Sequence, residues 1–132
     1  MKRFFDPSAQ EFQEPLQVES LLAAEVEEEA RLRGLTVFRM DGTRMANQQE
    51  MFREFARSFN FPDYFGMNWN ALDECLADLD WLDCSGYLLI IESSRAVLGG
   101  EGKEARRLLL DLLRDISEEW ATGGILFRVV LL

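Results

Sequence analysis

The stretch that decides the fold reads FPDYFGMNWNALDECL and covers residues 61–76. Pro62 stops the apolar pattern before it from continuing as one helix, and Asn68 has the side chain of a helix N-cap. Beyond this cap, apolar residues recur three or four positions apart, at Trp69, Leu72, Leu76 and Leu79. This spacing is typical of an amphipathic helix. We therefore predict a loop followed by a helix.

The charge around this stretch is entirely negative. From Ser58 to Ser94 the chain contains no lysine or arginine. It carries seven acidic residues there: Asp63, Asp73, Glu74, Asp78, Asp80, Asp83 and Glu92. A phosphate group would meet only like charge on this segment, whereas a cationic protein surface would be attracted to it. Aromatic side chains among the acids would add contact area, so the segment indicates a docking face for a basic protein.

Length and composition limit the possible functions. The chain has 132 residues, 48% of them hydrophobic, and a formal net charge of −10, which favours one domain with a core. Such an acidic chain is a poor candidate for binding nucleic acid or an anionic membrane surface. It contains no histidine, which removes Ser–His and Cys–His catalytic pairs and imidazole zinc sites. We expect no enzyme activity, no cofactor and no metal site.

The chain also lacks signals for export. Its first residues have no apolar core of the kind found in signal peptides, and no apolar run reaches the roughly 20 residues of a membrane span. We therefore expect a cytoplasmic protein whose two cysteines are reduced.

Periodicity along the chain predicts helices alternating with strands. Predicted helices cover residues 16–33, 47–59, the segment after Asn68, and 104–120; predicted strands cover 35–40, 87–91 and 125–132. Strands separated by helices favour parallel pairing through right-handed crossovers. We predict an α/β fold with a three-stranded, mostly parallel sheet packed with helices. The most apolar strand, at the C-terminus, is expected in the middle of the sheet.

We divide the chain into an N-terminal extension, residues 1–34, and a domain over residues 35–132. In the extension, residues 1–14 are polar and are expected to form a loosely held tail. The helix over residues 16–33 has only a narrow apolar stripe. We therefore expect an extra N-terminal helix that is dispensable for the fold.

Two features of the central stretch leave alternatives open. One face of its helix carries Asn70, Asp73, Glu74, Ala77 and Asp78. Surface helices usually mix both signs of charge, so this face is either an ordinary solvated face or a functional electrostatic field. The neighbouring aromatic residues, Tyr64 and Phe65, are either a lid on the core or contact residues.

The same residues resemble a known family. PDYFGMNWNALDECL, residues 62–76, is similar to the signature of the barstar family, intracellular inhibitors of secreted bacterial ribonucleases. The family pattern is a proline, an acid, two aromatics, glycine, any residue, asparagine, an apolar residue, Asp or Asn, alanine, leucine and, after two more positions, Cys-Leu. The similarity extends over about residues 35–132. It implies three parallel strands with packed helices, in agreement with the periodicity.

The resemblance also implies a mechanism and contact residues. In the family, the signature loop and helix plug the active-site cleft of the nuclease, and their carboxylates take the place of RNA phosphates. By position, Tyr64 is the loop aromatic that caps the cleft, and Glu74 is the central contact carboxylate. In the long helix Asp115 corresponds to a further acidic contact, and Glu119 lies one turn on. The predicted partner-binding residues are Tyr64, Phe65, Gly66, Asn68, Asn70, Asp73, Glu74, Asp78, Asp115 and Glu119.

Four positions depart from the family pattern. Asp73 stands where the family commonly has tryptophan, Asn70 replaces a contacting aspartate, and Glu74 is longer by one methylene than the usual aspartate. Leu79 corresponds to the second tryptophan of the family's contact loop, although Trp81 is close by. These departures favour a cognate nuclease different from the family's best-known target.

Together, the charge and the resemblance predict a proteinaceous inhibitor, or immunity protein, of a basic ribonuclease or nuclease toxin. Nucleic acid and membranes are not expected as partners, and the free protein is expected to be a monomer. The alternative hypothesis is an acidic binding module or regulatory subunit for a basic protein that is not a nuclease.

Overall fold

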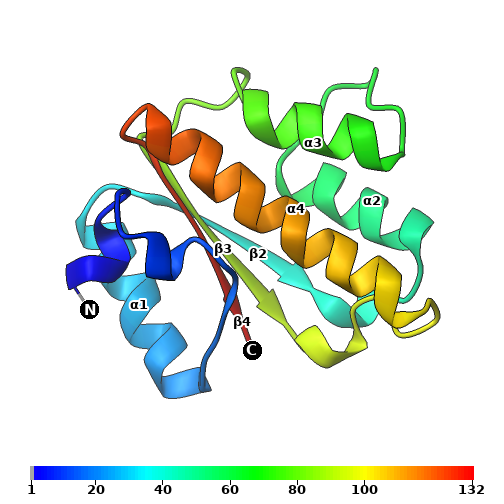
Figure 1. Cartoon of the computed structure of the whole chain (residues 1–132), viewed down its shortest axis with the longest axis horizontal. Helices are drawn as coiled ribbons and strands as arrows, with labels where there is room; N and C mark the ends of the chain where they lie inside the picture. The colour runs from blue at the N-terminus through cyan, green and yellow to red at the C-terminus, as the bar shows by residue number, and fades with distance from the viewer. Residues whose placement is uncertain (1) are drawn as a thin grey trace.

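The computed structural model describes residues 2–132 and shows a four-stranded parallel sheet between two layers of helices (Figure 1). The strands are β1 (Leu16–Gln17), β2 (Thr36–Asp41), β3 (Gly86–Glu92) and β4 (Leu126–Leu131), arranged in the order β1-β4-β3-β2. The predicted fold class is confirmed. The C-terminal strand β4 lies inside the sheet, as its apolar sequence predicts.

Four α-helices connect and cover these strands. They are α1 (Ser20–Leu32), α2 (Gln48–Ser58), α3 (Trp69–Asp78) and α4 (Lys103–Thr122). Figure 1 shows α1 on one side of the sheet and α2, α3 and α4 on the other. The helices lie on two sides because the connections cross the sheet in two directions. The crossover through α1 runs from β1 at one edge to β2 at the other, and the two later crossovers run back. Since each crossover is right-handed, opposite directions place the helices on opposite faces.

The sheet has one strand more than predicted. Residues 16 and 17, expected to begin a helix, instead form β1 and pair with Val130 and Leu131 of β4. The Val18 N–H continues this pairing by donating to the Leu131 carbonyl at 3.0 Å. The helix prediction was wrong here because the unpaired edge of β4 offers hydrogen bonds that local periodicity does not reveal.

The expectation of a loosely held N-terminal tail was also wrong. Lys2–Phe5 and Gln10–Phe12 form two short 3₁₀ helices, η1 and η2. Phe4, Phe5 and Ala9 are buried, and the ring of Phe4 packs edge-to-face on Phe12 at 5.6 Å. This segment lies beside α1 in Figure 1 and belongs to the same layer.

A buried arginine ties this segment to the sheet. Arg128 of β4 is only 1% exposed. Its guanidinium donates to the carbonyl oxygens of Phe4 at 2.7 Å, Asp6 at 2.6 Å and Ala9 at 3.3 Å. Burial lowers the pKa of Arg128 to about 10, which still keeps it charged at neutral pH. The sequence showed Arg128 only as an interruption in an apolar strand; the structure shows it as an anchor for the N-terminal segment.

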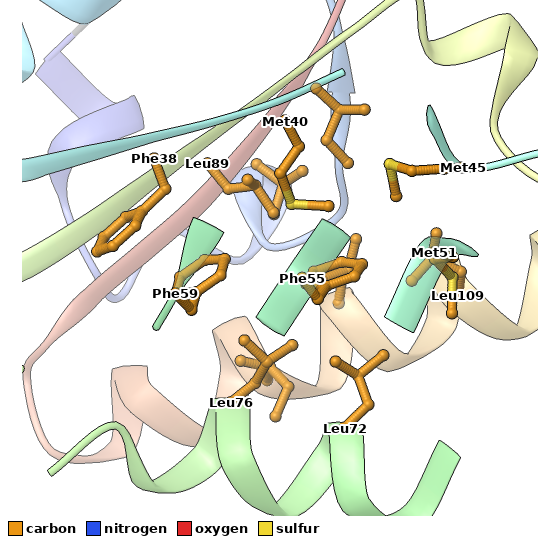
Figure 2. Close-up of a cluster of buried hydrophobic side chains, with 14 of the residues drawn as sticks. Phe38, Met40, Met45, Met51, Phe55, Phe59, Leu72, Leu76, Leu89 and Leu109 are labelled. Atoms are coloured by element: carbon orange, nitrogen blue, oxygen red, sulfur yellow. The ribbon is translucent and has the colours of Figure 1, made fainter. Parts of the chain in front are cut away.

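The core is divided by the sheet into two clusters. On the α1 side, the strand residues Leu88, Ile90, Leu126 and Val130 are covered by α1 and the N-terminal 3₁₀ helices. The larger cluster lies on the other side. Figure 2 shows Met51 and Phe55 of α2, and Phe59 at its C-cap, between strand residues and the leucines of α3, which lies farthest from the sheet. The extension therefore covers a sheet face that would otherwise be exposed and apolar.

Candidate partner-binding site

The helix α3 begins where the sequence predicts. The side-chain oxygen of Asn68 accepts a hydrogen bond from the Ala71 N–H at 2.8 Å, which makes it the N-cap. Its side-chain amide donates to the Gly66 carbonyl at 3.2 Å. One asparagine thus fixes both the start of the helix and the loop before it. Asn68, predicted as a contact residue, is exposed but is already occupied by these two bonds.

Two neighbouring aromatic residues of this loop point in different directions. Phe65 is half-buried and packs edge-to-face on Phe61 at 4.8 Å and on Phe52 at 6.2 Å. Tyr64 is 74% exposed. The two alternatives left open by the sequence therefore divide between the two residues: Phe65 covers the core, and Tyr64 presents a ring to solvent.

Five predicted contact residues lie around one hollow. This hollow, of about 130 Å³, lies between the loop and α3. It is lined by Tyr64, Phe65, Gly66, Ala71, Glu74, Cys75 and Asp78. A Cβ added to Gly66 would lie 3.1 Å from the side-chain nitrogen of Asn68, so glycine leaves room for the cap beside the hollow.

The hollow is strongly negative. Glu74 and Asp78 are one helical turn apart and both are exposed. The pKa of the Tyr64 phenol is raised, first by partial desolvation and then by negative charge on groups that include Asp78 and Asp80. Burial, followed by the charges of Asp78 and Glu74, also raises the pKa of the Cys75 thiol. A thiol held in its neutral form is a poor nucleophile, so the hollow is suited to binding a cation and not to covalent chemistry.

The surrounding carboxylates have no cation within the molecule. No salt bridge among residues 2–132 involves Asp63, Asp73, Glu74, Asp78, Asp80 or Asp83, and all six are exposed. Glu92, the seventh acid of the segment, pairs with Arg39 at 2.8 Å. Six unpaired charges of one sign repel one another, which gives this surface a preference for a basic partner.

Other predicted contact residues lie outside the hollow. Asn70 and Asp73 are exposed on α3 but do not line it. Asp115 and Glu119 are exposed on α4, and the Asp115 carboxylate accepts hydrogen bonds from Arg114 at 3.1 and 3.2 Å. The charge of Asp115 is thus partly balanced within the chain, whereas Glu119 forms no ion pair with any described residue.

Three tryptophans hold the layer that carries the site. The indole N–H of Trp69 donates to the Gln48 side chain at 3.0 Å. Those of Trp81 and Trp120 donate to the carbonyls of Phe59 and Leu76, both at 2.9 Å. These bonds join α3 and its following loop to α2 and α4. Sequence reasoning missed this function, although half-buried tryptophans commonly place their N–H on a partner.

Within residues 2–132, no cluster of three or more acidic, cysteine or histidine side chains is placed to hold a metal ion. None of the helices in this range combines the length and the apolar character needed to cross a bilayer.

Comparison with known proteins identifies the family. No match was found among curated proteins. Residues 35–132 match the family described as Barstar (barnase inhibitor). The match begins just before β2 and includes the loop, α3, α4 and β4, so it contains every residue of the hollow. The chain therefore belongs to the Barstar (barnase inhibitor) family.

Proposed function

We propose that this protein inhibits a basic ribonuclease or nuclease toxin by covering its active site with α3 and the loop before it. It acts by binding and not by catalysis, as an immunity protein in the cytoplasm of the cell that makes the nuclease, and it is a monomer until it meets its target.

The observation that carries this proposal is the hollow with its unpaired acids, in a chain of the inhibitor family. A ribonuclease must hold RNA phosphates, so its cleft is cationic. The unpaired carboxylates around Tyr64 and Glu74 provide the complementary potential. Such complementarity speeds encounter and selects the partner.

The positions of the side chains suggest separate contributions to binding. The exposed ring of Tyr64 offers apolar area that a partner can bury. Glu74 and Asp78 lie beside this ring on the wall of the same hollow, where an arginine or lysine of the nuclease would be desolvated. Outlying acids such as Asp83 would act at longer range, through the rate of association.

The arrangement of charges on this surface favours a target nuclease that differs from the family's best-known target. Asn70 contributes no charge at a position where the family often has aspartate, whereas Asp78 adds one at the hollow. Two of the unpaired carboxylates, those of Glu74 and Asp78, therefore lie beside Tyr64 in the hollow. A nuclease matched to this arrangement would place its cations there, and specificity would follow from this placement.

Cleavage of RNA by a panel of cationic bacterial ribonucleases, with increasing amounts of the purified chain, tests the proposal. We expect stoichiometric inhibition of at least one nuclease and no RNA cleavage by the chain alone. The double variant Glu74→Gln/Asp78→Asn should lose most of the inhibition. A charge-matched control, Glu28→Gln/Glu104→Gln, changes two exposed acids elsewhere and should retain it.

Two outcomes would contradict the proposal. Equal loss of inhibition in both double variants would show that only net charge matters. Capture of a basic protein from the source cell without any effect on a nuclease would favour the alternative of a regulatory binding module.

A further inference from the structure

A second hollow is lined by residues of the N-terminal layer. Figure 1 shows this layer on the other side of the sheet from α3. It has a volume of about 170 Å³ and only apolar side chains line it. The lining residues are Phe4, Phe12, Leu16, Val18, Leu22 and Val26. All of them precede residue 35, so this hollow lies outside the part of the chain that matches the inhibitor family.

The rim of the hollow exposes more apolar surface. Leu22, at its edge, is 41% exposed, and Leu21 next to it is 81% exposed. Single exposed leucines are ordinary on protein surfaces. Here Leu22 itself lines a concave apolar site, and such a site can accept an anchor side chain from a partner.

On the α1 side the charges beside this apolar surface are negative, whereas on η1 Lys2 and Arg3 precede Phe4, and Arg3 pairs with Glu11 at 2.6 Å. From Glu19 to Ala30 there is no lysine or arginine. Glu19 and Glu25 stand three residues before and after Leu22, both are exposed, and neither is in a salt bridge with a described residue. Glu25 lies one turn after Leu22 on α1, and Glu19 is the N-cap residue directly before this helix, so both carboxylates lie near Leu22 at the edge of the hollow.

The cations at the end of α1 do not offset this charge. Arg31 pairs with Glu27 at 2.8 Å, and Arg33 lies 3.7 Å from Glu29. These pairs leave Glu25 in the first half of α1, and Glu19 just before the helix, as unpaired acids near Leu22. A ligand for this surface must therefore combine a bulky apolar group with positive charge on both sides of it.

We propose that this hollow is a second docking site, which binds a short basic peptide segment of a partner protein through one bulky apolar side chain. The apolar side chain enters the hollow between α1 and the N-terminal 3₁₀ helices. Lysine or arginine residues on either side of it pair with Glu19 and Glu25. The site lies on the opposite side of the sheet from α3, so both sites can be occupied at once, and the proposal does not depend on inhibition of a nuclease.

A peptide titration of the full chain tests this site directly. The probe is the peptide Gly-Lys-Lys-Ala-Phe-Ala-Lys-Lys-Gly, observed through the methyl NMR signals of Val18, Leu22 and Val26. We expect saturable shifts of these signals. A peptide with serine in place of phenylalanine should bind at least tenfold more weakly, and one with glutamate in place of lysine should not bind.

Charge-reversal variants of the protein distinguish specific binding at this hollow from nonspecific attraction of a basic peptide to an acidic protein. Glu19→Lys/Glu25→Lys should weaken peptide binding at least tenfold. The control Asp63→Lys/Asp83→Lys makes the same change in net charge at exposed positions beyond the sheet and should leave binding at the hollow unchanged.

Four results would overturn the proposal. They are the absence of saturable shifts up to millimolar peptide, equal affinity for the serine peptide, shifts confined to the surface around Tyr64, and equal weakening by both double variants. Concentration-dependent shifts of the same methyl groups without peptide, together with a dimer in sedimentation, would show instead that a second copy of the chain occupies the hollow.

Discussion

Two sets of polar groups, one on each side of the sheet, have opposite roles. In the N-terminal layer, the carbonyls of Phe4, Asp6 and Ala9 point inward and receive the guanidinium of Arg128. In the α3 layer, the carboxylates of Glu74 and Asp78 point outward and have no cation among the described residues. Polar groups satisfied within the molecule serve the fold, and unpaired charges on a firmly held helix are available to a partner.

Removing the N-terminal layer should give the largest effect. Deletion of residues 2–33 exposes Leu88, Ile90, Leu126 and Val130 on one face of the sheet and takes the acceptors from Arg128. We expect loss of the cooperative thermal transition, measured by circular dichroism. This is the opposite of what the narrow apolar stripe of the extension led us to expect from sequence. An unchanged melting curve would show that the extension is dispensable for the fold.

On the other side of the sheet, a single carboxylate should control binding without affecting stability. Glu74→Ala should weaken nuclease inhibition by tenfold or more, since removing one member of a desolvated charge pair costs on the order of 2–5 kcal/mol. Faster dissociation should account for most of the loss. Stopped-flow kinetics and thermal melting of the same samples measure the two effects.

Asp83→Ala is the matched control for Glu74→Ala. Asp83 is exposed and unpaired but does not line the hollow. Its removal should slow association slightly, and only at low ionic strength. Equal small effects from both variants would mean that the field around α3 is diffuse and has no central contact.

A single substitution at Arg128 tests how much the hydrogen bonds to the N-terminal layer contribute to stability. Arg128→Met keeps an unbranched side chain but removes one donor from each of three carbonyls. The Asp6 and Ala9 carbonyls still accept from the Ala9 and Phe12 N–H groups, at 3.0 and 3.2 Å, so among the described residues only the Phe4 carbonyl loses its donor altogether. Since one unsatisfied buried group costs about 1–3 kcal/mol and the charged hydrogen bonds to the other two carbonyls are also lost, we expect the free energy of unfolding to fall by about 3 kcal/mol. A shift of the urea midpoint at constant slope would measure it. A more stable variant would show that burying the charge costs more than its hydrogen bonds contribute.

The smallest effect concerns two helix caps. Asn68 caps α3, and Asn47 caps α2 in the same way, accepting from the Glu50 N–H at 2.9 Å. Replacing either by alanine should cost about 1 kcal/mol of stability. Only Asn68→Ala should also weaken inhibition, because Asn68 holds the Gly66 carbonyl beside the hollow. Equal inhibition by both variants would show that the loop keeps its shape without this bond.

Most of the fold could be predicted from sequence because its signals are local. Asn47 and Asn68 mark helix starts, and the uninterrupted apolar run before Glu92 marks a buried strand. The errors lie in the N-terminal extension, where structure depends on distant partners. β1 exists only because β4 offers it an edge, and the 3₁₀ helices are held by Arg128 from the far end of the chain.

The sequence predicted which charged residues belong to the candidate site, but it could not predict which of them lie together around one hollow. The absence of basic residues around α3 is visible by reading the chain, and so is the resemblance in the loop. That Tyr64, Glu74 and Asp78 share one hollow while Asp73 does not depends on how the loop folds back on the helix. Likewise, the pairing of Asp115 with Arg114 depends on the conformations of the two side chains, which their spacing in the sequence does not specify.

The positions of the tryptophans have a consequence for spectroscopy. All three indoles are hydrogen-bonded around α3 and its neighbours, at Gln48, Phe59 and Leu76, and the N-terminal layer contains no tryptophan. Intrinsic tryptophan fluorescence is therefore a reporter for one side of the sheet. Fluorescence and far-ultraviolet circular dichroism recorded on the same melt would coincide if the two sides unfold together, and would separate if the N-terminal layer detaches first.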